Sequence, residues 1–468
     1  MFERSMVALL RLAGLVVLVA QSACSTLPEP VVAPAPEIPT HWQNTVVEPA
    51  TDLSRWWLRF DDLLMARLIS DALDANPGIS SARAALRQAR ALRDVSNAAL
   101  YPALNASLSA SQTRTADLRS ELYGTGLDAS WEIDVFGANR STLRAADAAA
   151  SASAASLGDV QVSVAAEVAL DYISLRSAQQ RLGIAQNNLL VQENTQQISE
   201  WRRQAGLITS LETEQASSAL EQTRALLPAL QIAIAQSAHA LAVLTGRTPD
   251  ALLEPLRTVA TVPQPAANIA LSFPAETLRQ RADVRAAEFQ VQAAVARVSA
   301  ADAARLPSFQ LGGTLGLNSL TLAGLGSGAS VVSSVLATIS MPLLNGGANH
   351  AQIALQEAAL AQVRSDYQAN VLKALLEVED ALVALRGDKL SLARLGLAAI
   401  AAVNAADLAG QRFQSGLIDF QSVLDTQRSR LNTQDSVAIA YAALSSDHVR
   451  LYKALGGGWL SDENLSTP

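Results

Sequence analysis

In four stretches of the chain, apolar residues recur at every second position, which is the pattern of a β-strand with one apolar face. Each stretch is about ten residues long, enough for a tilted strand to cross a lipid bilayer. The apolar positions are Leu104, Ala106, Leu108 and Ala110, then Leu127, Ala129, Trp131 and Ile133, then Phe309, Leu311, Leu315 and Leu317, and finally Val331, Val335, Ala337 and Ile339.

The strands are expected to form two pairs, each joined by a polar or glycine-rich loop, at 112–124 and 318–330. Pro102 and Pro307 precede the first strand of each pair, where a missing backbone amide is tolerated. Edge amides find no partner in hydrocarbon, so strands in a membrane must close into a barrel. Bacterial barrels begin at about eight strands, so several copies of the chain are expected to pool their strands.

Two long stretches without proline, Asn139–Ala205 and Ala348–Ser415, are predicted to be helices. At about 1.5 Å per residue, each would extend about 100 Å if helical throughout. Pro228 lies inside another apparent helix, where we expect a kink. Apolar residues in the long stretches follow the spacing of helices that pack side by side in coiled coils. These residues are Val168, Leu175, Leu182 and Leu189, and then Val371, Leu375, Val378, Leu382, Leu385 and Leu392.

The chain contains an internal duplication. The phrase RRQAGLITSL at 202–211 returns as RFQSGLIDFQ at 412–421, an offset of 412 − 202 = 210 residues. The phrase FGANR at 136–140 returns as GGANH at the same offset. Each half is therefore predicted to contain a helix, two strands, a long helix, a glycine turn and a further helix. Gly206 and Gly416 are expected to end the long helices in the left-handed conformation that glycine tolerates.

Composition narrows the classes of function. Half of the 468 residues are apolar but only 4% are aromatic, and the abundance of alanine suits close-packed helices. The formal net charge is −8 and no basic run occurs, so no nucleic-acid partner is expected.

Candidates for catalysis are few. No hydrolase or phosphate-loop motif occurs, and the tightest carboxylate cluster, Glu377 with Glu379 and Asp380, is expected to solvate a coiled-coil face. We therefore expect no enzyme activity, no catalytic residue, no metal and no other cofactor. The four histidines are scattered without metal-ligand spacing: His41, His239, His350 and His448.

The N-terminus has the layout of a signal peptide, with an apolar stretch at Val7–Ala20 followed by small residues. Residues 1–23 are assigned to it. Cys24 is the only cysteine, so no intramolecular disulfide is possible. Its position resembles the lipid-attachment cysteine of bacterial lipoproteins, although Gln21 stands where that pattern has leucine. We expect a covalent N-terminal lipid on Cys24.

Prolines mark the boundary of the folded part. Six of the 17 prolines fall between Pro28 and Pro49, which predicts an extended tether of polyproline character. The predicted organisation is a signal peptide at 1–23, a lipidated tether at 24–55, a first repeat at 56–256, a second repeat at 270–457 and a C-terminal tail at 458–468.

Three stretches carry a resemblance to a known family: SWEIDVFG at 130–137, RQRADVRAAE at 279–288, and Trp56–Trp57 together with ALDANP at 72–77. They resemble the TolC/OprM family of outer-membrane efflux channels, in its lipoprotein (NodT-like) branch. The second stretch departs from that family's RRPDVRAAE at Gln280 and Ala282. The likeness covers about residues 55–456, nearly the whole mature chain.

The resemblance implies a mainly α fold with a membrane β portion. Three chains would form an α-barrel of long coiled-coil helices, and four strands from each would form a twelve-stranded β-barrel. The implied function is the exit duct of a tripartite efflux pump, which passively conducts drugs or other small molecules from the periplasm to the exterior. The implied partners are outer-membrane lipid, a periplasmic adaptor and an inner-membrane transporter of the RND type.

The resemblance also implies roles for single residues. Asp425, nine residues past Gly416, would face the tunnel constriction, where a symmetric ring of carboxylates prefers cations; the alternative is a solvated helix face. Some relatives hold the mouth closed with a tyrosine and an arginine at positions that are Phe413 and Ile418 here. Either arginine of the turns could instead complement its own helix C-terminus. The implied adaptor-contact residues are Arg202, Gly206, Leu207, Arg412, Gly416 and Leu417.

Two other classes of function are alternatives. An exported enzyme on a lipid anchor would need a catalytic motif. A structural or adaptor coiled-coil lipoprotein of an envelope export complex, without its own pore, would need no strands of bilayer length.

Overall fold

The computed structural model of the chain describes residues 53–115, 118–265, 280–326 and 331–459. The predicted signal peptide, Cys24, nearly all of the predicted tether and most of the predicted C-terminal tail lie outside the described residues. The described part forms two compact units. The first comprises Ala91–Ala149 and Gln290–Arg364, and the second comprises the other described residues.

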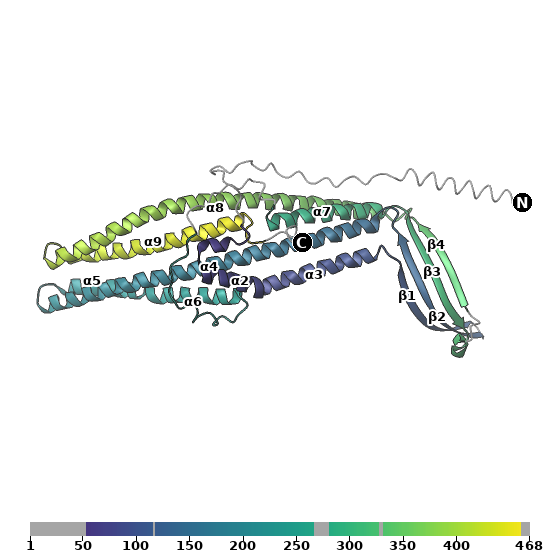
Figure 1. Cartoon of the computed structure of the whole chain (residues 1–468), viewed down its shortest axis with the longest axis horizontal. Coiled ribbons are helices and arrows are strands. Elements are labelled where there is room, and N and C mark those ends of the chain that lie inside the picture. Colours follow the sequence, from purple (N-terminus) through teal and green to yellow (C-terminus); the bar gives the residue numbers. More distant parts are fainter. Residues whose placement is uncertain (1–52, 116–117, 266–279, 327–330, 460–468) are drawn as a thin grey trace. The chain divides into compact units, whose positions relative to one another are not determined.

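The first unit holds a four-stranded antiparallel sheet in which the strands follow one another in chain order (Figure 1). Directly paired residues share a face of a sheet, so the register tests the predicted alternation. Leu104 pairs with Ala129, Ala129 with Gly313, and Gly313 with Val335, which places all four predicted apolar sets on one face. The strands are β1 (Ala103–Thr115), β2 (Leu118–Ile133), β3 (Ser308–Ser319) and β4 (Val331–Ser340).

The predicted loop at 112–124 is wrong, because β1 and β2 remain paired as far as Thr115 and Leu118. The strands are therefore 13 and 16 residues long instead of about ten. The extension is polar, and Gln112 donates a hydrogen bond to Glu121 across it at 2.9 Å. The β1 side of this extension carries no apolar residue, so hydrophobic alternation does not predict the ladder there. The second predicted loop does contain a short helix, η3 (Leu322–Gly326), after β3 ends at Ser319.

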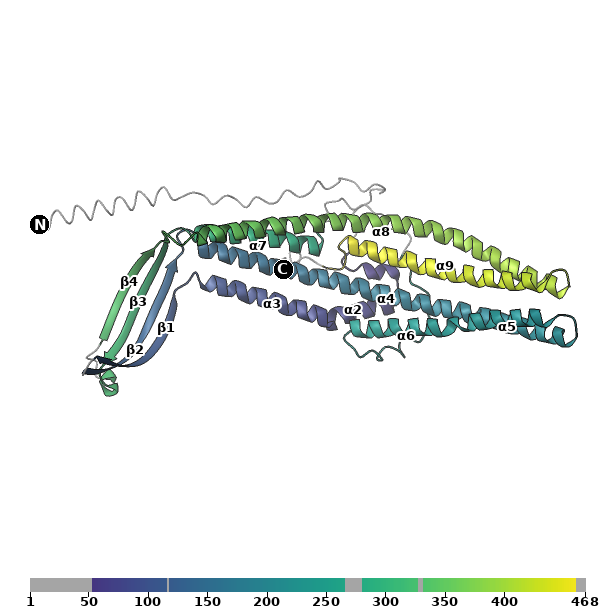
Figure 2. The ribbon, with the colours of Figure 1, turned by 180° about the vertical axis from the view of Figure 1, so that it is seen from behind.

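The two long helices are confirmed to within one residue at each end. They are α4 (Ala138–Gln204) and α8 (Ala348–Gln414), of 67 residues each. Each turns at its C-terminal end into an antiparallel return helix, so that the second unit contains two helical hairpins (Figures 1 and 2). The first hairpin returns through α5 (Ser210–Arg224) and α6 (Leu226–Leu244), and the second returns through α9 (Phe420–Ala454).

Pro228 lies just after an interruption of its helix at Ala225, which separates α5 from α6. It is the third residue of α6, and α5 ends at Arg224, four residues earlier. A proline ring clashes with the carbonyl four residues before it and offers that carbonyl no amide, so the helix ends where the clash would fall. The equivalent helix α9 has no proline and runs unbroken for 35 residues.

The core of the second unit gathers around an aromatic cluster. Trp56, in the short helix η1 (Trp56–Phe60), stacks on Tyr452 of α9 with ring centroids 5.4 Å apart. Asp62 caps helix α2 (Leu63–Ala75) by accepting the amides of Leu64 and Met65, and it also accepts the hydroxyl of Tyr172 at 2.9 Å. The opening segment is thus tied to both long hairpins. The remaining helices are α3 (Pro77–Ala98) and α7 (Ala282–Ala303).

Candidate functional site

The candidate site is the pair of turns that end the hairpins. Gly206 and Gly416 adopt φ angles of +72° and +73°, as predicted for glycines that end helices. The amide of Leu207 donates to the carbonyl of Arg202 at 2.9 Å, and the amide of Leu417 donates to the carbonyl of Arg412 at 2.9 Å. Both turns are therefore Schellman motifs with the same hydrogen bonds.

The helices that leave the turns are capped by different residues. Thr209 forms a capping box with Glu212 at the start of α5. Asp419 accepts the amide of Ser422 at 2.7 Å at the start of α9, and the hydrogen bonds from Ser422 hold the pKa of Asp419 below its ordinary value. Both turns are thus closed locally by their own residues, so each forms without a partner.

The apex of each turn presents an apolar side chain to solvent. Leu207 is 72% exposed and Leu417 is 73% exposed. Trp201, in the last turn of α4, is 61% exposed, although indole rings are usually at least half buried. Exposed aromatic and aliphatic side chains on rigid turns can fill the grooves of another helix pair.

The two hairpins meet through Arg202. Its guanidinium carbon lies 4.3 Å from the ring centroid of Phe413, and its Nη2 lies 3.5 Å from the carbonyl oxygen of Phe413. Phe413 packs in turn on Phe420, with ring centroids 5.3 Å apart. The sequence interpretation did not include this cluster. Its only local signal is that two of the chain's eight phenylalanines fall within one turn phrase.

Asp425 lies on α9 and is about half exposed. Its carboxylate accepts Gln421 Nε2 at 3.0 Å and lies 3.8 Å from Arg428 Nη1, both on the same helix. Gln421 and Arg428, on the same helix, partly screen this carboxylate. Asp425 lies farther along the chain than the residues of the Arg202–Phe413 contact. Its predicted role at a constriction stays a prediction.

Glu377 does more than solvate a helix face, which corrects the sequence interpretation. It accepts Arg281 Nη2 at 2.7 Å, and Arg281 also pairs with Asp283 at 2.8 Å and donates to the carbonyl of Ala454 at 2.7 Å. Burial alone would raise the pKa of Asp283, but hydrogen bonds and charge from Arg281 hold it below its ordinary value. Arg281, a residue of the stretch RQRADVRAAE, therefore joins α7, α8 and the end of α9.

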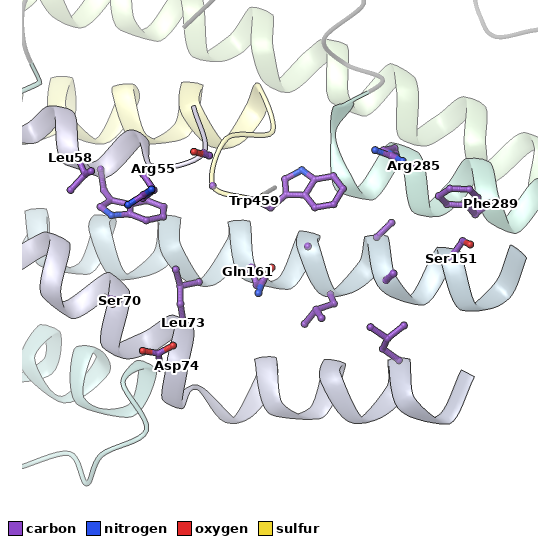
Figure 3. A pocket seen from close by; sticks show the side chains of 18 of the residues that line it. Arg55, Leu58, Ser70, Leu73, Asp74, Ser151, Gln161, Arg285, Phe289 and Trp459 are labelled. Carbon is purple, nitrogen blue, oxygen red and sulfur yellow. The ribbon is translucent and has the colours of Figure 1, made fainter. Parts of the chain in front are cut away.

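A cavity of about 880 Å³ opens on the second unit between α4 and the segments that flank it (Figure 3). Arg285 lies at its rim, with its guanidinium 5.9 Å from the ring of Phe289 and 5.8 Å from that of Trp459. Trp459 packs on Gly158, where a Cβ atom would come within 2.6 Å of the indole. No histidine or cysteine lines the cavity, and no group of three potential metal ligands occurs in the part of the chain that the structure describes.

The class of protein to which the chain belongs follows from its similarity to known proteins. The family model described as "Outer membrane efflux protein" matches residues 68–247 and 273–457. The chain belongs to this family. The predicted fold class and the predicted function, the outer-membrane component of an efflux pump, are thereby confirmed.

Particular relatives agree with this class. The chain is 32% identical over 424 residues to "Toluene efflux pump outer membrane protein TtgF" of Pseudomonas putida, covering 88% of this chain and 86% of the relative. It is 31% identical to "Outer membrane protein OprJ" of Pseudomonas aeruginosa, covering 97% and 96%. Among solved structures, the outer-membrane channel OprN matches with a TM-score of 0.84 and 32% identity, covering 91% of this chain and 99% of OprN.

Proposed function

We propose that three copies of this chain form the passive exit duct of a tripartite efflux pump, with the strands in the outer membrane and the helical hairpins in the periplasm. The observation that carries the proposal is the four-stranded sheet, most of whose apolar residues share one face and whose two edge strands pair on one side only within the described residues. Three such sheets would give twelve strands and leave no open edge.

The apolar face has the character of a lipid-facing surface. Leu108 is 80% exposed and Val335 is 83% exposed in the single chain. Tyr123 and Trp131 lie on this face of β2 eight residues apart, about 27 Å along a strand at about 3.4 Å per residue. Aromatic residues flank the apolar band of outer-membrane barrels at a similar separation, about 25 Å.

The opposite face is mostly polar, with Val332 and Leu336 of β4 as apolar exceptions, and suits a water-filled interior. Ser107 donates to Asp128 at 2.9 Å across β1 and β2, and the hydroxyls of Thr314 and Ser334 are 2.7 Å apart across β3 and β4. A closed barrel with this face inside would conduct small polar solutes without chemistry. We accordingly propose that the protein is a channel and has no catalytic site or cofactor.

An unpartnered stripe on α8 supports assembly of several chains. Five exposed apolar residues follow one another at intervals of four or seven residues, the spacing of a coiled-coil seam. An 18-residue window of this helix has a mean hydropathy of 1.5 but is only 17% buried within the chain. Helices of a neighbouring protomer would cover it. The residues are Leu372, Leu376, Val383, Leu390 and Leu397.

The hairpin turns are proposed as the contact with a periplasmic adaptor, which links the duct to an inner-membrane transporter of the RND type. The two Schellman turns and the exposed Leu207 and Leu417 support this assignment. Asp425 is proposed at the constriction, and Cys24 is proposed to carry the lipid anchor in the outer membrane. The contact residues are Arg202, Gly206, Leu207, Arg412, Gly416 and Leu417.

Conductance tests the proposal. The purified protein, reconstituted in planar bilayers, is expected to show stepwise single-channel currents and to be trimeric in detergent. Deleting the gene for the protein is expected to increase drug susceptibility. A monomer without stepwise conductance would instead favour a structural or adaptor coiled-coil lipoprotein, the second candidate. The relatives' names include both toluene and cation efflux, so no exported compound is assigned.

A further inference from the structure

The two turn arginines hold equivalent places in the repeats but have different surroundings. Arg202 stacks its guanidinium on Phe413 at 4.3 Å and points Nη2 at the Phe413 carbonyl. Arg412 is exposed and makes no ion pair, hydrogen bond or ring contact through its side chain within the described residues. The two arginines are therefore equivalent in the sequence repeat but differ in their side-chain contacts.

The difference follows from one position in the repeat. The residue equivalent to Phe413 in the first hairpin is Arg203, since 413 − 210 = 203, and it pairs with Glu200 at 2.6 Å. Only the second hairpin therefore carries an aromatic ring at this position of the repeat. Arg412 has no corresponding ring at the first turn, where the position carries a guanidinium of like charge.

Hydrophobic contacts hold the ring of Phe413 in place. It packs on Phe420, which is buried with Leu424 of α9 against Ala216 of α5. The cluster thus joins the return helices of both hairpins next to the contact between Arg202 and Phe413. A ring fixed in this way presents its face to the guanidinium without losing further side-chain freedom, which favours the stacked geometry.

We propose that Arg202 is a positioning residue that clasps the two hairpins of one protomer together at the periplasmic mouth through Phe413, and that Arg412 has no part in this clasp. The inference rests on the proposed function, because it treats these turns as the mouth of a channel. The contact joins residues 211 positions apart, so the closed arrangement depends on it and separation of the hairpins must break it. Arg412 keeps its guanidinium available to an acceptor on the adaptor.

Paired arginine variants test the clasp in planar bilayers. Arg202→Ala is expected to raise the open probability of the trimer about two- to fivefold for each clasp removed, from the usual strength of an exposed cation–π contact. Phe413→Leu should give the same increase, and the double variant should add little to either. Phe413→Tyr keeps the ring face and should retain the low open probability. Arg203→Ala is the matched control, because Arg203 pairs only with Glu200 of its own helix in the described residues, and it should conduct as the parent does.

A second measurement does not depend on conductance. Spin labels at Leu207→Cys and Leu417→Cys, in a Cys24→Ser background and in labelled protomers diluted with unlabelled ones, report the distance between the two turns of one protomer. Arg202→Ala should widen that distance distribution, and Arg203→Ala should not. Equal effects of Arg202→Ala and Arg203→Ala on distance and conductance would overturn the clasp. Widened distances in a protein that never conducts would uphold the clasp and reject the channel.

Discussion

At the scale of single residues, the molecule depends on a few charged side chains that are buried or stacked. Arg281 is the clearest, with a side chain that is 7% exposed and shared between two carboxylates and a backbone carbonyl. The motif RQRADVRAAE made this arginine visible in the sequence, but its partners lie on α8 and α9, 96 and 173 residues away. The turn glycines, by contrast, depend only on neighbouring backbone, and their positive φ angles agree with the sequence prediction.

Replacing Arg281 should be costly. Arg281→Ala leaves Asp283 without this partner and leaves Glu377 with Lys373 at 3.9 Å. Because both carboxylates are about a third exposed, the cost should lie at the lower end of the about 3–5 kcal/mol for breaking a buried ion pair. Thermal unfolding in detergent measures the effect. The control is Arg257→Ala, because Arg257 and Glu254 form an ion pair that is 79% and 82% exposed. Exposed pairs contribute at most about 1 kcal/mol, so the control should unfold nearly as the parent does. If both variants lost the same amount of stability, Arg281 would contribute no more to the fold than an exposed arginine does.

At the scale of elements, alternate residues of each strand face two different proposed environments, lipid on one side of the sheet and water on the other. Val335 lies on the proposed lipid face and Ser334 on the proposed interior face, one residue apart in β4. The pattern of the sequence predicted this division for all four strands. It did not predict the polar extension of β1 and β2, because backbone pairing there has no hydrophobic signature.

The parity of β4 can be tested with one charge. Val335→Lys should destabilise assembly by about 2–4 kcal/mol, the cost of lysine at the bilayer midplane in outer-membrane barrels. Ser334→Lys should assemble normally and change ion selectivity, because its side chain would face water. The yield of heat-resistant trimer from outer membranes measures assembly. Normal assembly of Val335→Lys would place that face away from lipid.

Helix α9 carries two adjacent groups with opposed responses to pH. Burial, with Asp388 nearby, raises the pKa of Asp447 to about 6, and burial, with Lys389 nearby, lowers the pKa of His448 to about 4. The native state therefore binds a proton more tightly at Asp447 and less tightly at His448 than the unfolded chain does. As pH rises from about 4 to about 6, Asp447 lowers stability and His448 raises it.

Single substitutions should separate the two responses. In Asp447→Asn only the histidine of this pair remains, so between about pH 4 and pH 6 stability should rise more, or fall less, with pH than it does in the parent. In His448→Gln only the carboxylate of this pair remains, so between about pH 4 and pH 6 stability should fall more with pH than it does in the parent. Unfolding midpoints at several pH values measure the slopes. Slopes that match the parent in both variants would contradict the assignment.

At the scale of the whole molecule, the described chain leaves sheet edges and an apolar helix stripe uncovered. The sheet has unpaired edges, and α8 exposes an apolar stripe that a soluble monomer would not keep. Heptad spacing in the sequence indicated that the long helices pack side by side. It did not separate the face that packs within the chain from the face left for a neighbour, because both carry leucine and valine.

The stripe predicts the effect of polar substitutions on assembly. Leu390→Gln combined with Leu397→Gln should weaken each interface by about 3–6 kcal/mol, since burying one leucine contributes about 1.5–3 kcal/mol. Light scattering after size-exclusion chromatography should then show monomers in place of trimers. The matched control is Ser391→Gln with Ala398→Gln, one residue along the helix at the same spacing. A trimer that survives the leucine substitutions would show that the stripe faces elsewhere.

The sequence by itself determined the features that are local or repeated. Alternation along each strand, the two proline-free helices, the glycine turns and the duplication all leave a trace within a few residues or at a constant offset. Only the tertiary structure decided the features that join distant segments. Arg281 with Glu377 and Arg202 with Phe413 depend on which helices lie together, and such contacts leave no periodic trace because each involves one residue at one place in the fold.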